Sequence, residues 1–188
     1  INEIWGYTTK GIAKSNEEMN AHLSTTDQST IGSNWAAGDI MYEDTNNDKQ
    51  INDGARTITD HGDLKVIGNS TPRFLWGIDL NASWKGFDIR AFFQGVMKRD
   101  AWLGGSWGSL EYYFGATNYG EWWATGITAV KDYYRDANTW SVANGYQKAN
   151  QDAFLPRATF SNKNERCQTR SLMNAAYMRL KNFQAGYT

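Results

Sequence analysis

A short acidic segment has the residue types and the spacing of a calcium-binding loop. Oxygen-bearing side chains recur there at every second position, the spacing with which an EF-hand-type loop wraps one hard cation. The fourth of these residues would contribute its backbone carbonyl. They are Asp44, Asn46, Asp48, Gln50 and Asn52. The pattern makes a Ca²⁺ site one candidate chemistry for this chain.

Two positions of this loop depart from the EF-hand pattern. Lys49 stands where the sharp turn favours glycine, and Ala55 stands where a bidentate carboxylate closes the coordination sphere. Asp53 is a substitute for that carboxylate, although it comes two residues earlier. Without a metal, the same residues would form an Asx-rich turn, so both interpretations stay open.

A second candidate site is a long segment, residues 101–146, that is rich in tryptophan and tyrosine and interrupted by glycine. Its rings could stack on the apolar faces of sugars. Trp122 and Trp123 are the best candidates for such a contact, and Trp102 and Trp107 are further ones. Alternatively, the rings pack the segment onto itself or onto a partner protein, because a long ordered loop must bury something. We favour packing for most of these rings.

The sequence does not support other kinds of chemistry. It contains no Ser/His/Asp arrangement of a hydrolase and no glycine-rich phosphate loop. Cys167 is the single cysteine, which excludes a disulfide framework within the chain and a cysteine-rich zinc site. With 19 Lys+Arg and 20 Asp+Glu, the net charge is −1, and no basic stripe indicates nucleic acid. We therefore expect a protein that is not an enzyme.

The composition indicates an all-β protein. An aromatic fraction of 14%, 18 glycines, 2 prolines and a mean hydropathy of −0.65 are not the profile of a helical bundle. They fit an all-β domain, a carbohydrate binder or an outer-membrane barrel. No apolar run reaches the roughly 18 residues of a membrane helix. No secretory signal opens the chain, so we expect an internal part of a longer protein.

The strongest structural signal is an alternation of period two on both sides of Lys85-Gly86. Apolar residues fall at even positions in 74–84 and at odd positions in 87–97, with mostly small or polar residues between them. A two-residue turn with a positive φ at the glycine would place Trp84 opposite Phe87. The two apolar faces would then join into one.

This hairpin fits either a membrane or a soluble protein. Strands of about ten residues with one apolar face match transmembrane β-strands, but a hairpin that covers a sandwich core alternates in the same way. The strand length favours the membrane, as do the aromatic residues at the turn end, where an interfacial girdle would lie. The polar face would then line the lumen of a barrel, and its residues are Asp79, Asn81, Asp88, Arg90 and Gln94.

Loop lengths predict the topology. Outer-membrane barrels have short periplasmic turns and long extracellular loops, so Lys85-Gly86 would face the periplasm. A third run near the end of the chain alternates at Phe183, Ala185 and Tyr187 but not before them. The chain thus divides into an extracellular loop region with the EF-hand-like loop and strand ends (1–73), a transmembrane hairpin (74–97), a long aromatic-rich extracellular loop (98–176) and a late barrel strand (177–188).

Several motifs follow one another at a specific spacing through nearly the whole chain. They are Asp44 to Asp48 with Ile51, Arg56-Thr57, Val66-Ile67-Gly68-Asn69, Pro72-Arg73-Phe74, Gly86-Phe87-Asp88, Phe92-Phe93-Gln94-Gly95, Trp140 with Pro156-Arg157, and Tyr177-Met178-Arg179-Leu180-Lys181-Asn182 with Gly186-Tyr187-Thr188. Together they resemble the SusC/RagA family of TonB-dependent outer-membrane transporters. Lys49 and Ala55 are the departures, and they concern the metal loop only.

The resemblance implies an importer of glycans or oligopeptides in the outer membrane of a Gram-negative bacterium. Such a protein is an antiparallel transmembrane β-barrel of about 22 strands that is closed by an N-terminal plug, capped by a SusD-like lipoprotein and energised by TonB. This chain would be a late barrel segment with its loops extracellular and its strands in outer-membrane lipid. The plug and the TonB-binding segment would lie outside it.

Two alternatives remain at this stage. The first is a secreted β-sandwich carbohydrate-binding module, and the weaker second is a fragment of a glycan-degrading enzyme. One group of apolar side chains discriminates between a barrel and a module, because it would face away from the protein in a barrel and into a core in a module. Its members are Trp76, Ile78, Leu80, Ile89 and Phe93.

Overall fold

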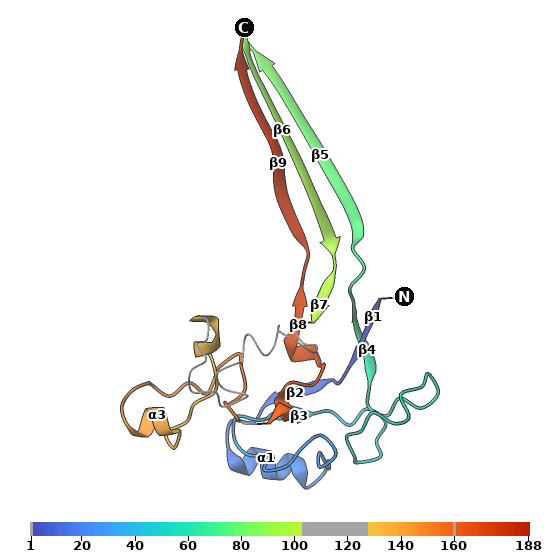
Figure 1. The fold of residues 1–188 in the computed structure, drawn as a ribbon, viewed down its shortest axis with the longest axis vertical. Coiled ribbons are helices and arrows are strands. Elements are labelled where there is room, and N and C mark those ends of the chain that lie inside the picture. Colours follow the sequence, from blue (N-terminus) through green and yellow to red (C-terminus); the bar gives the residue numbers. More distant parts are fainter. Residues whose placement is uncertain (1, 103–127, 160) are drawn as a thin grey trace. The chain divides into compact units, whose positions relative to one another are not determined.

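The computed structural model of the chain describes residues 2–102, 128–159 and 161–188 (Figure 1). Their regular structure is mostly β-strand with few helices, and the chain divides into two compact units. Within these described ranges, each helix is too short or too polar to cross a membrane. Unit 1 consists of Ile1–Ile4, Gly68–Trp102 and Leu172–Thr188, and unit 2 consists of Trp5–Ile67 and Leu103–Ser171.

Unit 1 is built on a long three-stranded antiparallel sheet in the order β5-β6-β9 (Figure 1). The strands are β5 (Arg73–Trp84), β6 (Phe87–Lys98) and β9 (Tyr177–Tyr187). Their bounds agree with the three runs expected from the sequence to within one residue. Two shorter antiparallel strands, β7 (Asp100–Trp102) and β8 (Leu172–Asn174), belong to the same unit. Because period-two alternation is local, the sequence was sufficient to predict the long strands.

The turn between β5 and β6 has the predicted geometry. Lys85 and Gly86 both have a positive φ, 46° and 86°, which is the requirement of a two-residue hairpin turn of type I′. Trp84 consequently pairs with Phe87, as the alternation predicted. The backbone N–H of Thr188 donates to the carbonyl oxygen of Gly86 at 2.8 Å, so the end of β9 lies beside this turn.

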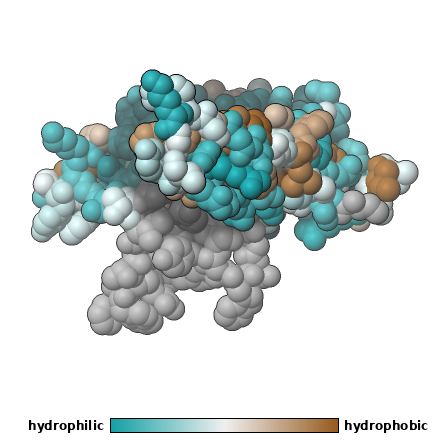
Figure 2. Space-filling model, turned by 90° about the horizontal axis from the view of Figure 1, so that it is seen from above, coloured by the Kyte–Doolittle hydropathy of each residue, from teal (hydrophilic) through white to brown (hydrophobic). Residues whose placement is uncertain are grey.

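The register joins the apolar positions of the three strands into one face. Cross-strand rows run through Trp84, Phe87 and Tyr187, then Ala82, Ile89 and Ala185, then Leu80, Ala91 and Phe183. Side chains on this face are not covered by the described residues: Trp84 is 70% exposed, Leu80 55% and Phe183 60%. Figure 2 shows that hydrophobic residues lie exposed at the surface next to hydrophilic ones. A contiguous apolar face of this kind indicates contact with something apolar.

A β-bulge explains why the alternation in β9 fails before Asn182. Phe92 pairs with Asn182, but the next residue, Phe93, pairs with Leu180, so Lys181 is an extra residue on β9. The bulge shifts the register by one and returns Leu180 and Met178 to the apolar face. Without this extra residue, the first part of β9 would present the wrong face.

Unit 2 has a compact core of its own. Strands β2 (Thr9–Ile12) and β3 (Ile40–Tyr42) pair in an antiparallel sheet within unit 2. Strands β1 (Glu3–Gly6) and β4 (Lys65–Asn69) also pair, and each has residues in both units. The helical segments are α1 (Asn16–Leu23), η1 (Thr128–Lys131), α3 (Trp140–Ala143), η2 (Asn162–Asn164) and η3 (Thr169–Ser171). The main buried cluster contains Tyr7, Ile31, Ile40, Tyr42 and Ile51.

Helix α1 lies in the region that we expected to be loop and strand ends. Its N-cap is Ser15, whose hydroxyl accepts a hydrogen bond from the N–H of Glu18 at 3.2 Å. The carboxylate of Glu18 in turn accepts from the backbone N–H of Lys14 at 2.6 Å. Serine followed three residues later by glutamate is the signature of a capping box, so the sequence contained a signal for this helix.

The bulge gives the first testable prediction. Deletion of Lys181 removes the extra residue, so residues 177–180 must either turn their side chains to the opposite face or lose their pairing with β6. We expect the amides of 177–180 to lose protection in hydrogen exchange, while those of 182–187 keep it. The substitution Lys181→Ala keeps the bulge and should leave the protection pattern unchanged. Full protection of 177–180 after the deletion would contradict the assigned register.

Candidate functional site

A fully buried carboxylate, Asp39, organises the site in unit 2. Arg157 donates from Nε to Oδ1 and from Nη2 to Oδ2, each at 2.8 Å. Lys163 lies 2.8 Å from Oδ2, and the amide of Asn164 donates to Oδ1 at 2.9 Å. These contacts tie residues that are more than a hundred positions apart in the sequence. They fix the direction of the Arg157 side chain, which lines the pocket described below.

The environment of Asp39 favours its charged form. Burial by itself would raise the pKa of this carboxyl, but the hydrogen bonds from Arg157, Lys163 and Asn164 outweigh burial and lower the pKa below its ordinary value. Asp39 is therefore a carboxylate at neutral pH. Removal of one of these partners would leave a buried charge uncompensated, which is strongly destabilising.

Gly38 allows the close approach that this arrangement needs. Its φ is +87°, a conformation that L side chains rarely adopt, and a Cβ there would collide with the ring of Tyr134 and with Arg157. Its carbonyl oxygen accepts from the N–H of Arg157 at 2.8 Å. The hydroxyl of Tyr134 donates to the carbonyl oxygen of Lys14 at 2.8 Å. A glycine thus brings the segment before β3 against the segment that carries Arg157.

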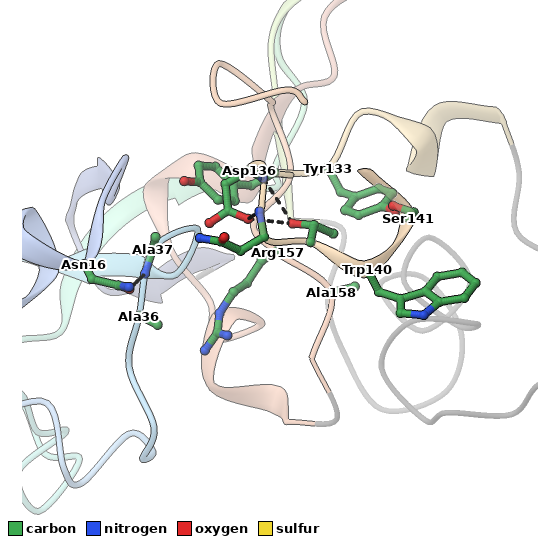
Figure 3. Close-up of a pocket in the computed structure, with 12 residues that line it drawn as sticks. Asn16, Ala36, Ala37, Tyr133, Asp136, Trp140, Ser141, Arg157 and Ala158 are labelled. Atoms are coloured by element: carbon green, nitrogen blue, oxygen red, sulfur yellow. Dashed lines mark hydrogen bonds between the residues drawn. The ribbon is translucent and has the colours of Figure 1, made fainter. Parts of the chain in front are cut away.

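Beside this cluster lies a pocket of about 490 Å³ (Figure 3). In Figure 3, Asn16 and Ala37 lie at one end, Asp136 and Arg157 near the middle and Trp140 at the other end. The lining is mixed, with polar groups, small side chains and aromatic rings. It consists of Asn16, Ala36, Ala37, Tyr133, Tyr134, Asp136, Asn138, Thr139, Trp140, Ser141, Arg157 and Ala158.

One wall of the pocket is a loop that closes on itself, residues 135–150, which we call the Trp140 loop. At its neck, Arg135 and Asn150 exchange backbone hydrogen bonds of 3.0 and 2.7 Å. Inside it, Gln147 accepts from the hydroxyl of Tyr133 at 2.8 Å and from that of Ser141 at 3.1 Å. These bonds connect the two arms of the loop, whose one helix, α3, has only a single turn.

The Trp140 loop presents two stacked rings. The ring centroids of Trp140 and Tyr146 are 5.3 Å apart, with an interplanar angle of 19°. Both side chains remain exposed, 70% and 72% respectively. The pair therefore adds little to the core of unit 2. Both rings belong to the aromatic segment 101–146, but the sequence does not distinguish them as site residues, because spacing alone does not show which rings stay exposed.

The predicted metal loop is a chain of Asx turns. Asp44 accepts backbone N–H bonds from Asn47 at 2.7 Å and Lys49 at 2.8 Å, and Asp48 accepts one from Gln50 at 2.7 Å. Lys49 has a φ of 68°, so this position adopts the left-handed turn for which the EF-hand pattern uses glycine. The backbone at Lys49 therefore adopts the turn of the EF-hand pattern, although the residue is lysine and not glycine.

Asp63, which lies outside the EF-hand-type spacing, closes the loop. This carboxylate is fully buried and accepts from the N–H groups of Thr45 and Asn52, at 2.7 and 2.9 Å. Asp53, the expected substitute for the closing ligand, forms an ion pair with Arg56. Across the described ranges, no three His, Cys, Asp or Glu residues are grouped so that they could hold a metal ion. Asparagine and glutamine oxygens would have to complete a Ca²⁺ site, which stays a prediction.

The residues predicted to line a lumen share the polar face of the sheet in unit 1. In the register, Asn81 opposes Arg90, and Asp88 and Gln94 follow on the same face. Arg90 donates to both oxygens of Asp79, at 3.0 and 2.5 Å. Near the turn, this face has a hollow of about 300 Å³. The structure thus brings together the five predicted residues on one surface, opposite the apolar face.

The predicted sugar-binding tryptophans fall largely outside the residues that the structure describes. Trp107, Trp122 and Trp123 lie outside the described residues. Trp102 is described: it is the last residue of β7 and is partly buried. A role of these four residues in substrate binding stays a prediction.

Comparison with known proteins indicates a distant relationship to TonB-dependent receptors. No protein-family model matches the chain. The chain is 24% identical over 190 residues to "TonB-dependent receptor P3" of Formosa agariphila. The match covers 100% of this chain but 15% of that protein, so the chain corresponds to a small part of the length of this relative.

The buried ion cluster predicts a large loss of stability in Asp39→Asn. The substitution leaves Lys163 and Arg157 without their anion, and removing one partner of a buried pair costs about 3–5 kcal/mol. Native-state hydrogen exchange at the amides of Ile40 and Tyr42 measures this loss. Asp152→Asn is the matched control, because Asp152 pairs with Lys14 at the exposed surface and its removal should leave the exchange rates unchanged.

The same cluster predicts the sign of a pH effect. The pKa of Asp39 is lower in the folded state than in the unfolded state, where it is about 3.9. The stabilisation from Asp39 is therefore complete above that pH and is lost as the pH falls through the folded-state pKa. Asp39→Asn should remove this part of the acid sensitivity of unit 2. An unchanged acid dependence in the variant would contradict a role for Asp39.

Proposed function

We propose that this chain is a late barrel segment of a SusC-like TonB-dependent importer of the outer membrane. The observation that carries the proposal is the continuous apolar face of β5, β6 and β9. Its rows of aromatic and aliphatic side chains stay exposed on one side of the sheet, while polar and charged residues occupy most of the other. Lipid on one side and a water-filled lumen on the other would require this distribution.

The strand length supports a membrane location. A strand of twelve residues, such as β5 or β6, is about 40 Å long. Tilted by about 40°, as strands of outer-membrane barrels are, it spans about 30 Å, the thickness of the hydrocarbon core. Trp84, Phe87 and Tyr187 form one row at the turn end, where an aromatic girdle would meet the interface.

The tight turn supports one orientation in the membrane. Short turns of outer-membrane barrels face the periplasm, so Lys85 and Gly86 would lie there. The residues of unit 2 would then belong to extracellular loops. A weak Ca²⁺ site in the acidic loop would be useful outside the cell, where calcium reaches millimolar concentrations.

The working importer would need partners beyond this chain. In the proposal, a SusD-like lipoprotein captures glycans or oligopeptides, the barrel admits them, and TonB supplies energy through another part of the protein. This chain would contribute wall and loops without catalysing a reaction. The distant similarity to a TonB-dependent receptor supports the proposal.

Paired substitutions on the two faces of β5 test the membrane location. Leu80→Arg places a charge on the proposed lipid face, which costs about 2–4 kcal/mol near the bilayer midplane. We expect less protein in the outer-membrane fraction and more of it degraded. Asn81→Arg adds the same charge one residue away on the opposite face and should be tolerated. Equal effects of the two substitutions, or wild-type protein that is soluble without detergent, would instead favour a secreted β-sandwich module.

Cysteine labelling tests the orientation. In a background that carries Cys167→Ser, which removes the native thiol, we substitute Lys85→Cys in the turn and Asp60→Cys in an exposed loop of unit 2, and treat intact cells with a maleimide that does not cross the outer membrane. The Asp60→Cys protein should be labelled, and the Lys85→Cys protein should react only after the outer membrane is permeabilised. Labelling of Lys85→Cys in intact cells would refute a periplasmic turn.

A further inference from the structure

We propose that the pocket beside the Trp140 loop binds a neutral oligosaccharide, with Trp140 as the ring on which a sugar stacks. The inference rests on the proposed function for its biological meaning, since it selects glycan over oligopeptide as the ligand class. It places the contact at a site in unit 2 that does not include the tryptophans predicted from the sequence to bind sugar.

The first observation is that a rigid loop holds two rings in the solvent. Asn144 donates from its side chain to the carbonyl oxygen of Trp140 at 2.8 Å. Tyr146 donates its N–H to the carbonyl oxygen of Ser141 at 2.8 Å, which returns the chain so that its phenol ring stacks on Trp140. A ring that is fixed before binding loses little conformational entropy when a ligand arrives.

The second observation is the exposure of the rings. The two rings shield one face of each other and little else of their surface is covered by the described residues. Leaving large apolar rings in water is unfavourable, so the loop is not explained by the stability of the core. The negative face of an indole attracts the polarised C–H groups on the apolar face of a pyranose ring.

The third observation is the polar lining next to Trp140. The backbone N–H of Asn138 and the hydroxyl of Thr139 both donate to Oδ1 of Asp136, at 3.0 and 2.9 Å, and within the part of the chain that the structure describes Oδ2 is open to accept from a ligand hydroxyl. The side chains of Asn138 and Ser141 add an amide and a hydroxyl. A group of acceptors and donors beside one stacking ring fits a polyhydroxylated ligand.

The charge of the lining disfavours an acidic oligosaccharide. Arg157 is the only basic side chain among the lining residues. Its Nε and Nη2 atoms already donate to the carboxylate of Asp39. The cavity of about 490 Å³ lies within the range of about 300–1,000 Å³ that small-molecule sites occupy. Its small walls, Ala36, Ala37 and Ala158, leave room for sugar rings but provide no deep apolar subsite for peptide side chains.

Fluorine NMR of the full-length protein tests the inference. The protein is labelled with 5-fluorotryptophan and kept in detergent, and the Trp140 resonance is assigned from its loss in Trp140→Phe. Neutral hexaoses of glucose, xylose, mannose or galactose are added singly, and tetra-alanine serves as the peptide probe. We expect a saturable shift of the Trp140 resonance with at least one hexaose and none with tetra-alanine.

Variants then locate the binding. Trp140→Ala should weaken the affinity about tenfold or more, the effect of losing one stacking contact, as measured by calorimetry. Asp136→Asn should weaken the affinity by a similar factor, because an amide NH₂ group replaces one of the two acceptor oxygens of the carboxylate. Phe154→Ala, which removes an exposed ring of unit 2 outside the pocket lining, should change it less than twofold. Unchanged resonances of the other tryptophans in Trp140→Ala would show that the variant is folded.

The outcomes separate this inference from the proposed function. No shift with any hexaose, a shift with tetra-alanine alone, or hexaose affinity that is unaffected by Trp140→Ala would each overturn it. If the hexaose binds at Trp140 in a protein that needs no detergent and is secreted, the saccharide site stands and the importer assignment falls. If the protein spans the outer membrane but Trp140 does not respond, the reverse holds.

Discussion

The structure of unit 1 depends on the pairing register of β5, β6 and β9. Side chains alternate along each strand, so a slip of one residue would move every apolar side chain of that strand to the polar face. Two local features fix the register. The Lys85-Gly86 turn sets β5 against β6, and the extra residue Lys181 sets β9 against β6 on both sides of the bulge. The apolar face exists because both features are present.

This sheet is incomplete by itself. Among the described residues, β5 and β9 have no strand paired to their outer edges, and the sheets are open. An unpaired edge is unfavourable in lipid because its backbone N–H and C=O groups have no partners there. The proposed function therefore requires neighbouring strands from a longer protein. The chain covers 15% of the TonB-dependent receptor to which it is similar, which is consistent with that requirement.

Unit 2 depends on a different interaction, the burial of one charge among many partners. Asp39 unites a segment before β3 with a segment near the end of the chain, through Arg157, Lys163 and Asn164. Gly38 permits the approach and Arg157 turns one side of its guanidinium toward Asp39 while its side chain lines the pocket. The ion pair with Asp39 thus positions Arg157 in the wall of the pocket in which we propose ligand binding. The Trp140 loop, which forms another wall, is held by its own hydrogen bonds.

Local sequence was enough to predict the long strands, their turn and their two faces, because a period of two and a Lys-Gly turn are properties of neighbouring residues. It also contains a capping-box signal for α1 at Ser15 and Glu18, in a region that we expected to be loop and strand ends. Only the tertiary structure showed that Asp39 meets Arg157, that Asp63 closes the acidic loop and that Trp140 stacks on Tyr146 in the open. The residues in such contacts are not neighbours in the sequence and meet only when the chain has folded, so their spacing in the sequence does not predict the contacts. Whether a ring is buried or exposed is likewise decided by what packs around it.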